Sequence, residues 1–404
     1  MENRQPRLHK NLIEAVIDSL ETIFGKGFYA DKVIERTLKS NPKWGSRDRA
    51  FIAESTYEIV RWWRYLWELY GKSPSLKRNE LTRIFGLWWR LNGQELPEWH
   101  GFEAVQDIDI KIAKRSLPND VGVQQSFPIW FDELANEDLG KDWPIIAQNL
   151  NLPAELIIRA NTLKTTRQEL KTIFKKEGVE THNFSENEVG LIFKQRQNIF
   201  SNASFKSGLF EVQDGGSQLI APFLRPEPGM KVIDACAGAG GKTLHLAALM
   251  QNKGSLIAMD VEERKLVELK RRAKRNGAHN IEIKHIEGSK TIKRLKDKAD
   301  RLLLDVPCSG TGVIKRNPDT KWKIKPEDLE KVKGIQQDIL NDYSTMLKSG
   351  GMMVYATCSI LHSENEDQVK TFLAKREDFK LIEEKRVNPS KVSDGFYMAL
   401  LQKA

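Results

Sequence analysis

The chain has 404 residues, of which 40% are hydrophobic and 29% charged, and this composition excludes a largely disordered protein. Lys and Arg number 64 against 55 Asp and Glu, so the formal net charge of +9 favours a polyanionic partner such as a nucleic acid. No apolar run approaches the length of a transmembrane helix, and the polar start lacks the apolar core of a signal peptide, so we expect a cytoplasmic protein with no membrane partner. The length predicts two or three domains.

Residues 1–150 are expected to form a helical domain. Apolar side chains recur three and four residues apart from Ile59 to Tyr70, and again from Ile84 to Leu91. The tryptophans in these two runs could stack on RNA bases, but their helical spacing favours a place in the core of a helix bundle. They are Trp62, Trp63, Trp67, Trp88 and Trp89.

Residues 151–215 are expected to form a small α/β module. A strand pattern at 156–161 precedes a helix that begins at Thr166, where the spacing to Glu169 is that of a capping box. Three further strand patterns follow, at 180–184, 190–193 and 209–213. Such a module can present its sheet to RNA, although packing alone accounts for the pattern equally well.

Residues 216–404 alternate between short apolar runs and helical stretches, which predicts a doubly wound α/β domain. Buried strands are expected at 231–234, 256–260, 281–285, 302–305 and 352–356. Helices are expected at 242–250, 262–276, 326–347 and 364–374. In such a sheet, ligands bind in the cleft outside the carboxyl ends of the strands.

A glycine-rich turn follows the strand at 231–234 and leads into a helix. Its residues are Cys236-Ala237-Gly238-Ala239-Gly240-Gly241-Lys242-Thr243, and its glycines let the backbone approach a ligand closely. It is not a P-loop, because Cys236 stands where the first glycine of G-x-x-x-x-G-K-[ST] belongs. It is not a dinucleotide fingerprint either, because Thr243 replaces the third glycine of G-x-G-x-x-G.

Two acidic residues at later strand ends favour an adenosine ligand. Asp260 closes the strand at 256–260 and can accept hydrogen bonds from both ribose hydroxyls. Glu287 follows the next strand, where it can reach the adenine amine. Without a phosphate-binding loop, this combination suits an adenosine that carries no phosphates, as in S-adenosylmethionine. The alternative is an ordinary strand-to-helix turn with surface acids.

The chain has only three cysteines, Cys236, Cys308 and Cys358, which argues against a disulfide framework and against a metal site. Cys308 and Cys358 each follow a predicted strand, and Asp305 ends the first of these strands. Because neighbouring strands deliver their carboxyl ends to one cleft, we expect the two thiols and the carboxylate to converge there. The alternative, that each thiol is a small buried apolar group, is weakened by the polar neighbours.

Together these motifs resemble the RNA (cytosine-5)-methyltransferase family of the Fmu/Sun type, and most of all its bacterial members that modify small-subunit ribosomal RNA. The resemblance is dense over residues 205–404, and a looser one, to a helical domain like the antitermination factor NusB, covers residues 47–70. Two departures stand out, because the family's glycine turn usually has alanine followed by proline where this chain has Gly238-Ala239, and its acid after the third strand is usually aspartate where this chain has Glu287. Besides the glycine turn, the matching residues are Gln213-Asp214, Ser217-Gln218, Asp305-Val306-Pro307-Cys308-Ser309, Arg316-Asn317-Pro318-Asp319, Lys321-Trp322, Thr357-Cys358-Ser359, Glu364-Asn365-Glu366 and residues 394–399.

The resemblance implies a Rossmann-like methyltransferase domain that uses S-adenosylmethionine and has an antiparallel last strand. It also implies that Cys358 is the nucleophile that adds to carbon 6 of cytosine, that Cys308 acts in product release, and that Asp305 contacts N3 of the base. Lys242 is a further candidate, either for lowering the pKa of a thiol or for meeting the carboxylate of the cofactor, and Cys236 is expected to pack beside the cofactor. The expected cofactor contacts are Asp234, Cys236, Ala237, Gly238, Ala239, Gly240, Gly241, Lys242, Asp260, Glu287 and Asp305.

The expected organisation is a NusB-like RNA-binding domain at 1–150, a small RNA-binding module at 151–215 and the catalytic domain at 216–404. RNA is the expected partner, ribosomal RNA before transfer RNA, and the chain is expected to be a monomer. Two other classes stay open. A ribosome assembly factor without catalysis would need neither thiol. A DNA cytosine-5 methyltransferase would use Cys308, the thiol of the Pro-Cys motif, as its nucleophile.

Overall fold

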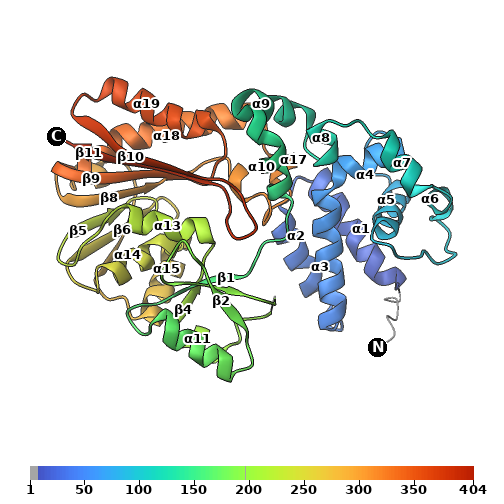
Figure 1. Cartoon of the computed structure of the whole chain (residues 1–404), viewed down its shortest axis with the longest axis horizontal. Coiled ribbons are helices and arrows are strands. Elements are labelled where there is room, and N and C mark those ends of the chain that lie inside the picture. The colour runs from blue at the N-terminus through green and yellow to red at the C-terminus, as the bar shows by residue number, and fades with distance from the viewer. Residues whose placement is uncertain (1–7, 196) are drawn as a thin grey trace. The chain divides into compact units, whose positions relative to one another are not determined.

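The computed structural model describes residues 8–195 and 197–404, and the chain forms two compact units. The first unit holds the residues up to Asn151 together with Ile314–Ile324, and the second holds Leu152–Val313 and Lys325–Ala404. The described part of the first unit is helical, whereas the second contains a small and a large sheet (Figure 1). Among the described residues, no helix is both long and apolar enough to cross a membrane.

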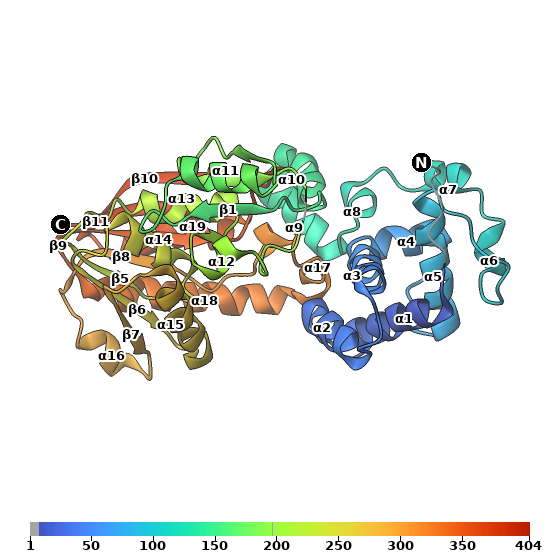
Figure 2. The same cartoon turned by 90° about the horizontal axis from the view of Figure 1, so that it is seen from below.

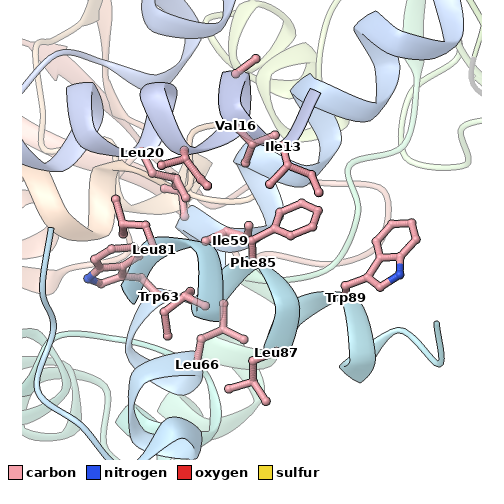
Figure 3. Close-up of a cluster of buried hydrophobic side chains, with 14 of the residues drawn as sticks. Ile13, Val16, Leu20, Ile59, Trp63, Leu66, Leu81, Phe85, Leu87 and Trp89 are labelled. Carbon is pink, nitrogen blue, oxygen red and sulfur yellow. The ribbon is translucent and has the colours of Figure 1, made fainter. Parts of the chain in front are cut away.

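The first unit is a helix bundle, and Figure 3 shows an apolar core that joins several of its helices. Leu20, Ile59 and Phe85 lie fully buried in this core, on three different helices. The predicted helical run from Ile59 to Tyr70 is broken at Trp62, whose ψ of 22° lies outside the helical range. The helices are α1 (Lys10–Gly25), α2 (Ala30–Ser40), α3 (Ser46–Arg61), α4 (Trp63–Tyr70), α5 (Arg78–Leu91), α6 (Glu103–Gln106), α7 (Ile110–Ser116), α8 (Val121–Gln124), α9 (Ile129–Leu139), α10 (Trp143–Leu150) and α17 (Thr320–Lys323).

The five tryptophans singled out in this unit fall into two groups. Trp63, Trp67 and Trp89 are at most 5% exposed, so the interpretation as core residues is confirmed for these three. Trp62 and Trp88 are half-buried and pack against the core from its edge. Their rings therefore keep surface that the core does not use.

The second unit begins with a four-stranded antiparallel sheet in the order β2-β3-β1-β4. Helix α11 packs on this sheet (Figure 2), with Phe174 edge-on to Phe193 and Phe210. The capping box is confirmed, because the Thr166 hydroxyl accepts from the Glu169 N–H at 3.2 Å and the Glu169 carboxylate accepts from the Thr166 N–H at 2.8 Å. The elements are β1 (Ile157–Ala160), α11 (Arg167–Lys176), β2 (Thr181–Asn183), β3 (Gly190–Phe193), α12 (Ala203–Lys206) and β4 (Phe210–Val212).

The large sheet has seven strands in the order β10-β11-β9-β8-β5-β6-β7. Five of them are parallel, and β11 runs antiparallel between β9 and β10. The strands are β5 (Lys231–Asp234), β6 (Ser255–Asp260), β7 (Ile281–His285), β8 (Ala299–Asp305), β9 (Leu347–Thr357), β10 (Phe379–Val387) and β11 (Phe396–Lys403). The helices are α13 (Gly215–Phe223), α14 (Gly241–Leu249), α15 (Glu263–Asn276), α16 (Ser289–Lys293), α18 (Pro326–Tyr343) and α19 (Glu366–Lys375).

Both faces of the large sheet are covered by helices, as the apolar strands predict. Side chains alternate along β8, so Leu302 and Leu304 lie in one buried cluster with Ile339 of α18. Leu303 lies in the other cluster with Leu244 of α14. The predicted doubly wound α/β fold with an antiparallel last strand is therefore confirmed.

Two predicted boundaries were wrong. The helix expected to reach residue 347 ends at Tyr343, and β9 begins at Leu347 rather than at residue 352. The first residues of β9 include the exposed Lys348 and Ser349 and a turn at Gly350, whose φ is +75°. This polar start hides the strand from a search for apolar runs. Strand β10 was not predicted, because between its two ends it is mostly exposed and charged.

Candidate active site

Four parallel strand ends lie side by side at one edge of the large sheet, because β6, β5, β8 and β9 are neighbours. Asp260 ends β6, Asp234 ends β5 and Asp305 ends β8. Cys358 follows directly after β9, and Cys308 lies three residues beyond β8. The three carboxylates and two of the three thiols therefore come from adjacent strand ends.

The glycine-rich turn between β5 and α14 is shaped by two residues with left-handed backbone, Gly238 at φ +52° and Gly240 at φ +90°. A Cβ at Gly240 would lie 2.7 Å from Leu269 Cγ, so only glycine fits there. A Cβ at Gly238 or Gly241 would meet nothing within 4 Å, so the turn leaves open space beside its backbone. This shape allows a ligand to lie against the turn.

The carboxylate of Asp260 holds the turn to the next strand end. Its Oδ2 accepts from the Gly238 N–H at 2.8 Å, and its Oδ1 accepts from the Glu262 N–H at 2.8 Å. Each oxygen accepts one bond and keeps a further lone pair. The side chain is thus oriented by the backbone and can still accept hydrogen bonds from a ribose.

Asp234 lies beneath the same turn and is 1% exposed. Its Oδ2 accepts from the Thr243 hydroxyl at 2.7 Å, whereas its Oδ1 has no hydrogen-bond partner within the described chain. Burial, against the hydrogen bond from Thr243, raises the pKa of Asp234 to about 7. Burial also raises the pKa of the Cys236 thiol well above its ordinary value, and Cys236 packs against the sheet core.

Two arginines hold backbone carbonyls of the turn from outside. Arg272 on α15 donates to Ala239 O at 2.8 Å and to Glu211 Oε2 at 2.8 Å. Arg159 on β1 donates to Gly241 O at 3.0 Å. Glu211 and Arg159 belong to the small four-stranded sheet, so this module supports the turn directly. The contacts of Arg272 and Arg159 with the turn were not predicted, because a salt bridge between residues 61 positions apart leaves no local sequence pattern.

Glu287 lies after β7 and is exposed. It lines a pocket of about 670 Å³ with Val261, Ile286 and Tyr343. Burial raises the pKa of Tyr343 to about 12, so its hydroxyl stays protonated. Tyr343 was not among the predicted cofactor contacts, because it lies at the end of α18, far in sequence from the glycine turn.

Lys242 and Asp305 form an ion pair inside the cleft. Lys242 Nζ lies 2.5 Å from Asp305 Oδ2, and the two side chains are 15% and 25% exposed. Burial disfavours the ammonium, but the carboxylate of Asp305 outweighs it, so the pKa of Lys242 is raised. Lys242 therefore stays charged and Asp305 keeps a fixed cationic partner.

The two thiols of the strand-end loops lie in contact. Cys308 Sγ is 3.3 Å from Cys358 Sγ, and the Cys358 N–H also points to Cys308 Sγ at 3.3 Å. The hydrogen bond with Cys358 and then burial raise the pKa of Cys308 well above its ordinary value. The Cys308 thiol therefore keeps its proton.

Both cysteine loops are tied to one fully buried carboxylate, that of Glu364. It accepts from the Ser309 N–H at 2.8 Å and from the hydroxyls of Ser309 and Ser359, which follow the two cysteines in sequence. Gln336 on α18 donates its Nε2 to the same carboxylate and to Pro307 O, both at 3.0 Å. The sequence analysis identified Glu364 only as part of a matching motif. That its carboxylate lies between the two cysteine loops was not predicted.

This donor set fits S-adenosylmethionine. The open glycine turn, the carboxylate of Asp260 and the unpartnered Oδ1 of Asp234 suit an uncharged ribose and the ammonium group of the zwitterionic methionine end. No basic side chain of the predicted set is left over for phosphates, because Lys242 is paired with Asp305. Among the described residues, no three His, Cys, Asp or Glu side chains gather as metal ligands.

Two sequence models of known families match the chain. One, described as 16S rRNA methyltransferase RsmB/F, matches residues 221–402, and another, described as an RsmF/B-like ferredoxin-like domain, matches residues 127–200. The "Probable ribosomal RNA small subunit methyltransferase B" of Synechocystis sp. is 31% identical over 89% of this chain and 88% of that protein. The "Ribosomal RNA small subunit methyltransferase B" of Proteus mirabilis is 33% identical over 75% of this chain and 70% of that protein. A crystallised methyltransferase homolog protein from Pyrococcus horikoshii superposes with a TM-score of 0.64 and 28% identity, over 71% of this chain and all of that one.

Proposed function

Because the chain belongs to the RsmB/F family and is therefore an S-adenosylmethionine-dependent RNA methyltransferase, we propose that it forms 5-methylcytosine in 16S ribosomal RNA through a covalent bond between Cys358 Sγ and carbon 6 of the base. The observation that carries this proposal is the contact of the two thiols at adjacent strand ends, 3.3 Å apart. The relatives from Synechocystis sp. and Proteus mirabilis are both named as methyltransferases of small-subunit ribosomal RNA, which supports ribosomal RNA as the substrate.

The first step makes carbon 5 of the cytosine nucleophilic. As Cys358 Sγ adds to carbon 6, its thiol proton passes through the carboxylate of Asp305, which pairs with Lys242 at 2.5 Å, to N3 of the base, so the protonated ring takes up the electron pair that the addition displaces. S-Adenosylmethionine supplies the methyl group, which carbon 5 then accepts. The neutral Cys308 thiol supports the addition, because its S–H can donate to the Cys358 thiolate.

The second step removes the proton from carbon 5 and breaks the bond between Cys358 Sγ and carbon 6. The largest cause of the raised pKa of Cys308 is its hydrogen bond with Cys358. Once Cys358 is bonded to the base, its sulfur carries no negative charge, so Cys308 loses its proton more easily. We infer that Cys308 first gives its proton to water and that its thiolate then takes the carbon 5 proton, directly or through a water molecule, while Cys358 leaves as a thiolate and N3 returns its proton to Asp305.

Two cysteine variants test the assignment with tritium-labelled methyl donor and 16S ribosomal RNA. We expect Cys358→Ala to abolish both methylation and the denaturant-stable protein–RNA adduct, because no thiol is left to add to carbon 6. We expect Cys308→Ala to accumulate the adduct, because release is blocked. An active Cys358→Ala variant together with adduct loss in Cys308→Ala would reverse the two roles and favour the DNA-enzyme pattern.

The substrate is tested separately with three RNAs, namely naked 16S ribosomal RNA, assembled small subunits and bulk transfer RNA. We expect label in ribosomal RNA at least tenfold above that in transfer RNA. Preference for transfer RNA would contradict the ribosomal part of the proposal and leave the chemistry standing. A wild-type protein that binds RNA but transfers no label would support an assembly factor without catalysis.

A further inference from the structure

A pocket of about 280 Å³ lies within the first unit, between α3, α4, α5, α7 and α8. Its volume falls just below the range of roughly 300–1,000 Å³ that is common for drug-sized ligands, so it suits a single flat group. The lining residues are Glu58, Trp62, Tyr65, Leu66, Trp88, Leu91, Asn92, Lys114 and Gln124.

Aromatic rings that the core leaves half-buried supply much of the wall. Trp63 is stacked on Phe24 with ring centroids 3.8 Å apart, as expected for a core residue. Trp62 instead meets Tyr65 edge to face at 5.9 Å, and both rings, like that of Trp88, line the pocket. Of the five tryptophans named in the two helical runs, the two that are half-buried are thus the two that line this pocket.

The polar groups of the pocket are only partly satisfied. Glu58 accepts from Trp62 Nε1 at 3.2 Å and from Arg61 Nε at 3.0 Å, one bond on each oxygen, so each oxygen can accept another. Within the described chain, the Lys114 ammonium, the Trp88 indole N–H and the Tyr65 hydroxyl make no hydrogen bond or ion pair. The pocket therefore combines a free cation, a carboxylate with spare acceptors and exposed ring faces.

We propose that this pocket binds one unpaired purine of an RNA chain, with the base against the Trp88 and Trp62 rings, its N–H donors on Glu58 and its phosphate near Lys114. Base stacking on aromatic side chains is the usual way in which single-stranded RNA is held, and a lysine adds the charge of a phosphate contact. Guanine fits best, because it presents two adjacent N–H donors to one carboxylate. The inference rests on the proposed RNA substrate and adds a second RNA contact, in the helical unit.

The test measures fluorescence anisotropy of labelled ten-residue oligoribonucleotides with the full chain. One probe carries a single guanosine among uridines, a second is all uridine, and unlabelled GMP serves as competitor. We expect the guanosine probe to bind at least fivefold more tightly than the uridine probe. We expect Trp88→Ala to raise its Kd about 5- to 150-fold, since stacking is worth about 1–3 kcal/mol per base.

Matched variants separate the pocket from general effects. Lys114→Ala should raise the Kd about threefold. It should also reduce the slope of log Kd against log salt concentration by about one, because one phosphate contact is lost. Lys111→Ala, an exposed lysine on the same helix, and Trp130→Ala, a half-buried tryptophan outside the pocket, should stay within twofold of wild type. Trp88→Phe should recover most of the affinity, which distinguishes a lost ring from a misfolded unit.

The possible outcomes distinguish the proposed purine pocket from the proposed methyltransferase function. Wild-type affinity in both Trp88→Ala and Lys114→Ala would overturn the pocket while ribosomal RNA methylation still stood. Equal binding of both probes would overturn the purine assignment. Competition by micromolar GMP would overturn the RNA assignment in favour of a free nucleotide. A wild-type protein that binds the probe but methylates no RNA would overturn the proposed function and leave the pocket standing.

Discussion

Two lysines are buried in different regions of the molecule, and their charges are met in different ways. Lys242, in the cleft of the second unit, faces the carboxylate of Asp305. Lys321, inside the first unit, faces neutral oxygens, namely the backbone carbonyls of Arg61, Gln125 and Ser126 at 3.0–3.2 Å and Asn151 Oδ1 at 2.7 Å. The Phe127 ring lies 4.1 Å from the same ammonium.

The two environments move the pKa in opposite directions. Asp305 outweighs burial, so the pKa of Lys242 is raised, whereas burial and the nearby Arg61 lower the pKa of Lys321 well below its ordinary value. The stability that Lys242 contributes is present below the unfolded pKa and is lost as pH rises through the folded one. The native state binds fewer protons at Lys321 than the unfolded chain does, so this site makes stability rise with pH up to about 10.5. The carboxylate of Asp305 keeps Lys242 charged inside the cleft. The neutral oxygens around Lys321 hold its side chain in position without raising its pKa.

Removing the opposite charge from the cleft should have the largest effect. We expect Asp305→Asn to lower the single-turnover rate of methylation about 1,000-fold, because the amide can neither share a proton with N3 nor pair with Lys242. Asp300→Asn is the matched control, since Asp300 lies on the same strand and pairs with Lys348 outside the predicted site. A rate within tenfold of wild type in Asp305→Asn would show that the ion pair is structural.

Replacing the other lysine should affect stability instead of chemistry. We expect Lys321→Met to lower the free energy of unfolding in urea by about 3 kcal/mol, because the buried oxygens around Nζ lose their donor. Lys323→Met, which removes a single bond to Ile23 O, should cost about 1 kcal/mol. If Lys321→Met unfolds at the wild-type urea concentration, the oxygens are satisfied by other donors.

Glu364 is a third buried charge. It lies in the second unit, as Lys242 does, but neutral donors hold it, as neutral oxygens hold Lys321. We expect Glu364→Gln to lower kcat about 10- to 30-fold with little change in KM for RNA, because the amide would turn an N–H toward the Ser309 N–H and loosen both cysteine loops. The adduct fraction in a Cys308→Ala background should fall by a similar factor. Glu366→Gln, which disturbs an ion pair with Arg386 instead, should keep kcat within threefold. Equal losses in both variants would assign Glu364 a general structural role.

A gradual effect, spread over two pH units, is expected from Asp234, a buried acid that has only one side-chain donor. Its pKa of about 7 lies above the unfolded value near 4, so between these values the native state binds more protons. The free energy of unfolding should therefore fall as pH rises from 5 to 7, by up to about 1.4 kcal/mol per pH unit. Asp234→Asn should flatten this slope in urea titrations at pH 5, 6 and 7. Asp300→Asn should not, since the pKa of Asp300 is lowered and lies below this range.

The parts of the fold with strong local patterns were predictable from the amino-acid sequence. Strands β5 and β7 were predicted to the residue, but only β5 is largely buried as predicted, because β7 lies at the edge of the sheet and none of its residues is buried. The helix after Thr166 was predicted from its capping box. The glycine turn, the carboxylates of Asp260 and Asp305 and the two cysteines were identified because each stands at a strand end or turn, which is local information.

Contacts between side chains that lie far apart in the sequence depend on how the elements pack, and they were not predicted. Strand β10 carries no alternating pattern, since most of it is exposed, and it pairs only because β11 lies beside it. Glu364 joins loops that are 50 residues apart, and Arg159 and Arg272 reach the glycine turn from other elements. The five tryptophans share one helical spacing, yet three are buried and two line a pocket. Spacing along a helix specifies a face, but which part of that face is covered depends on how the helices pack.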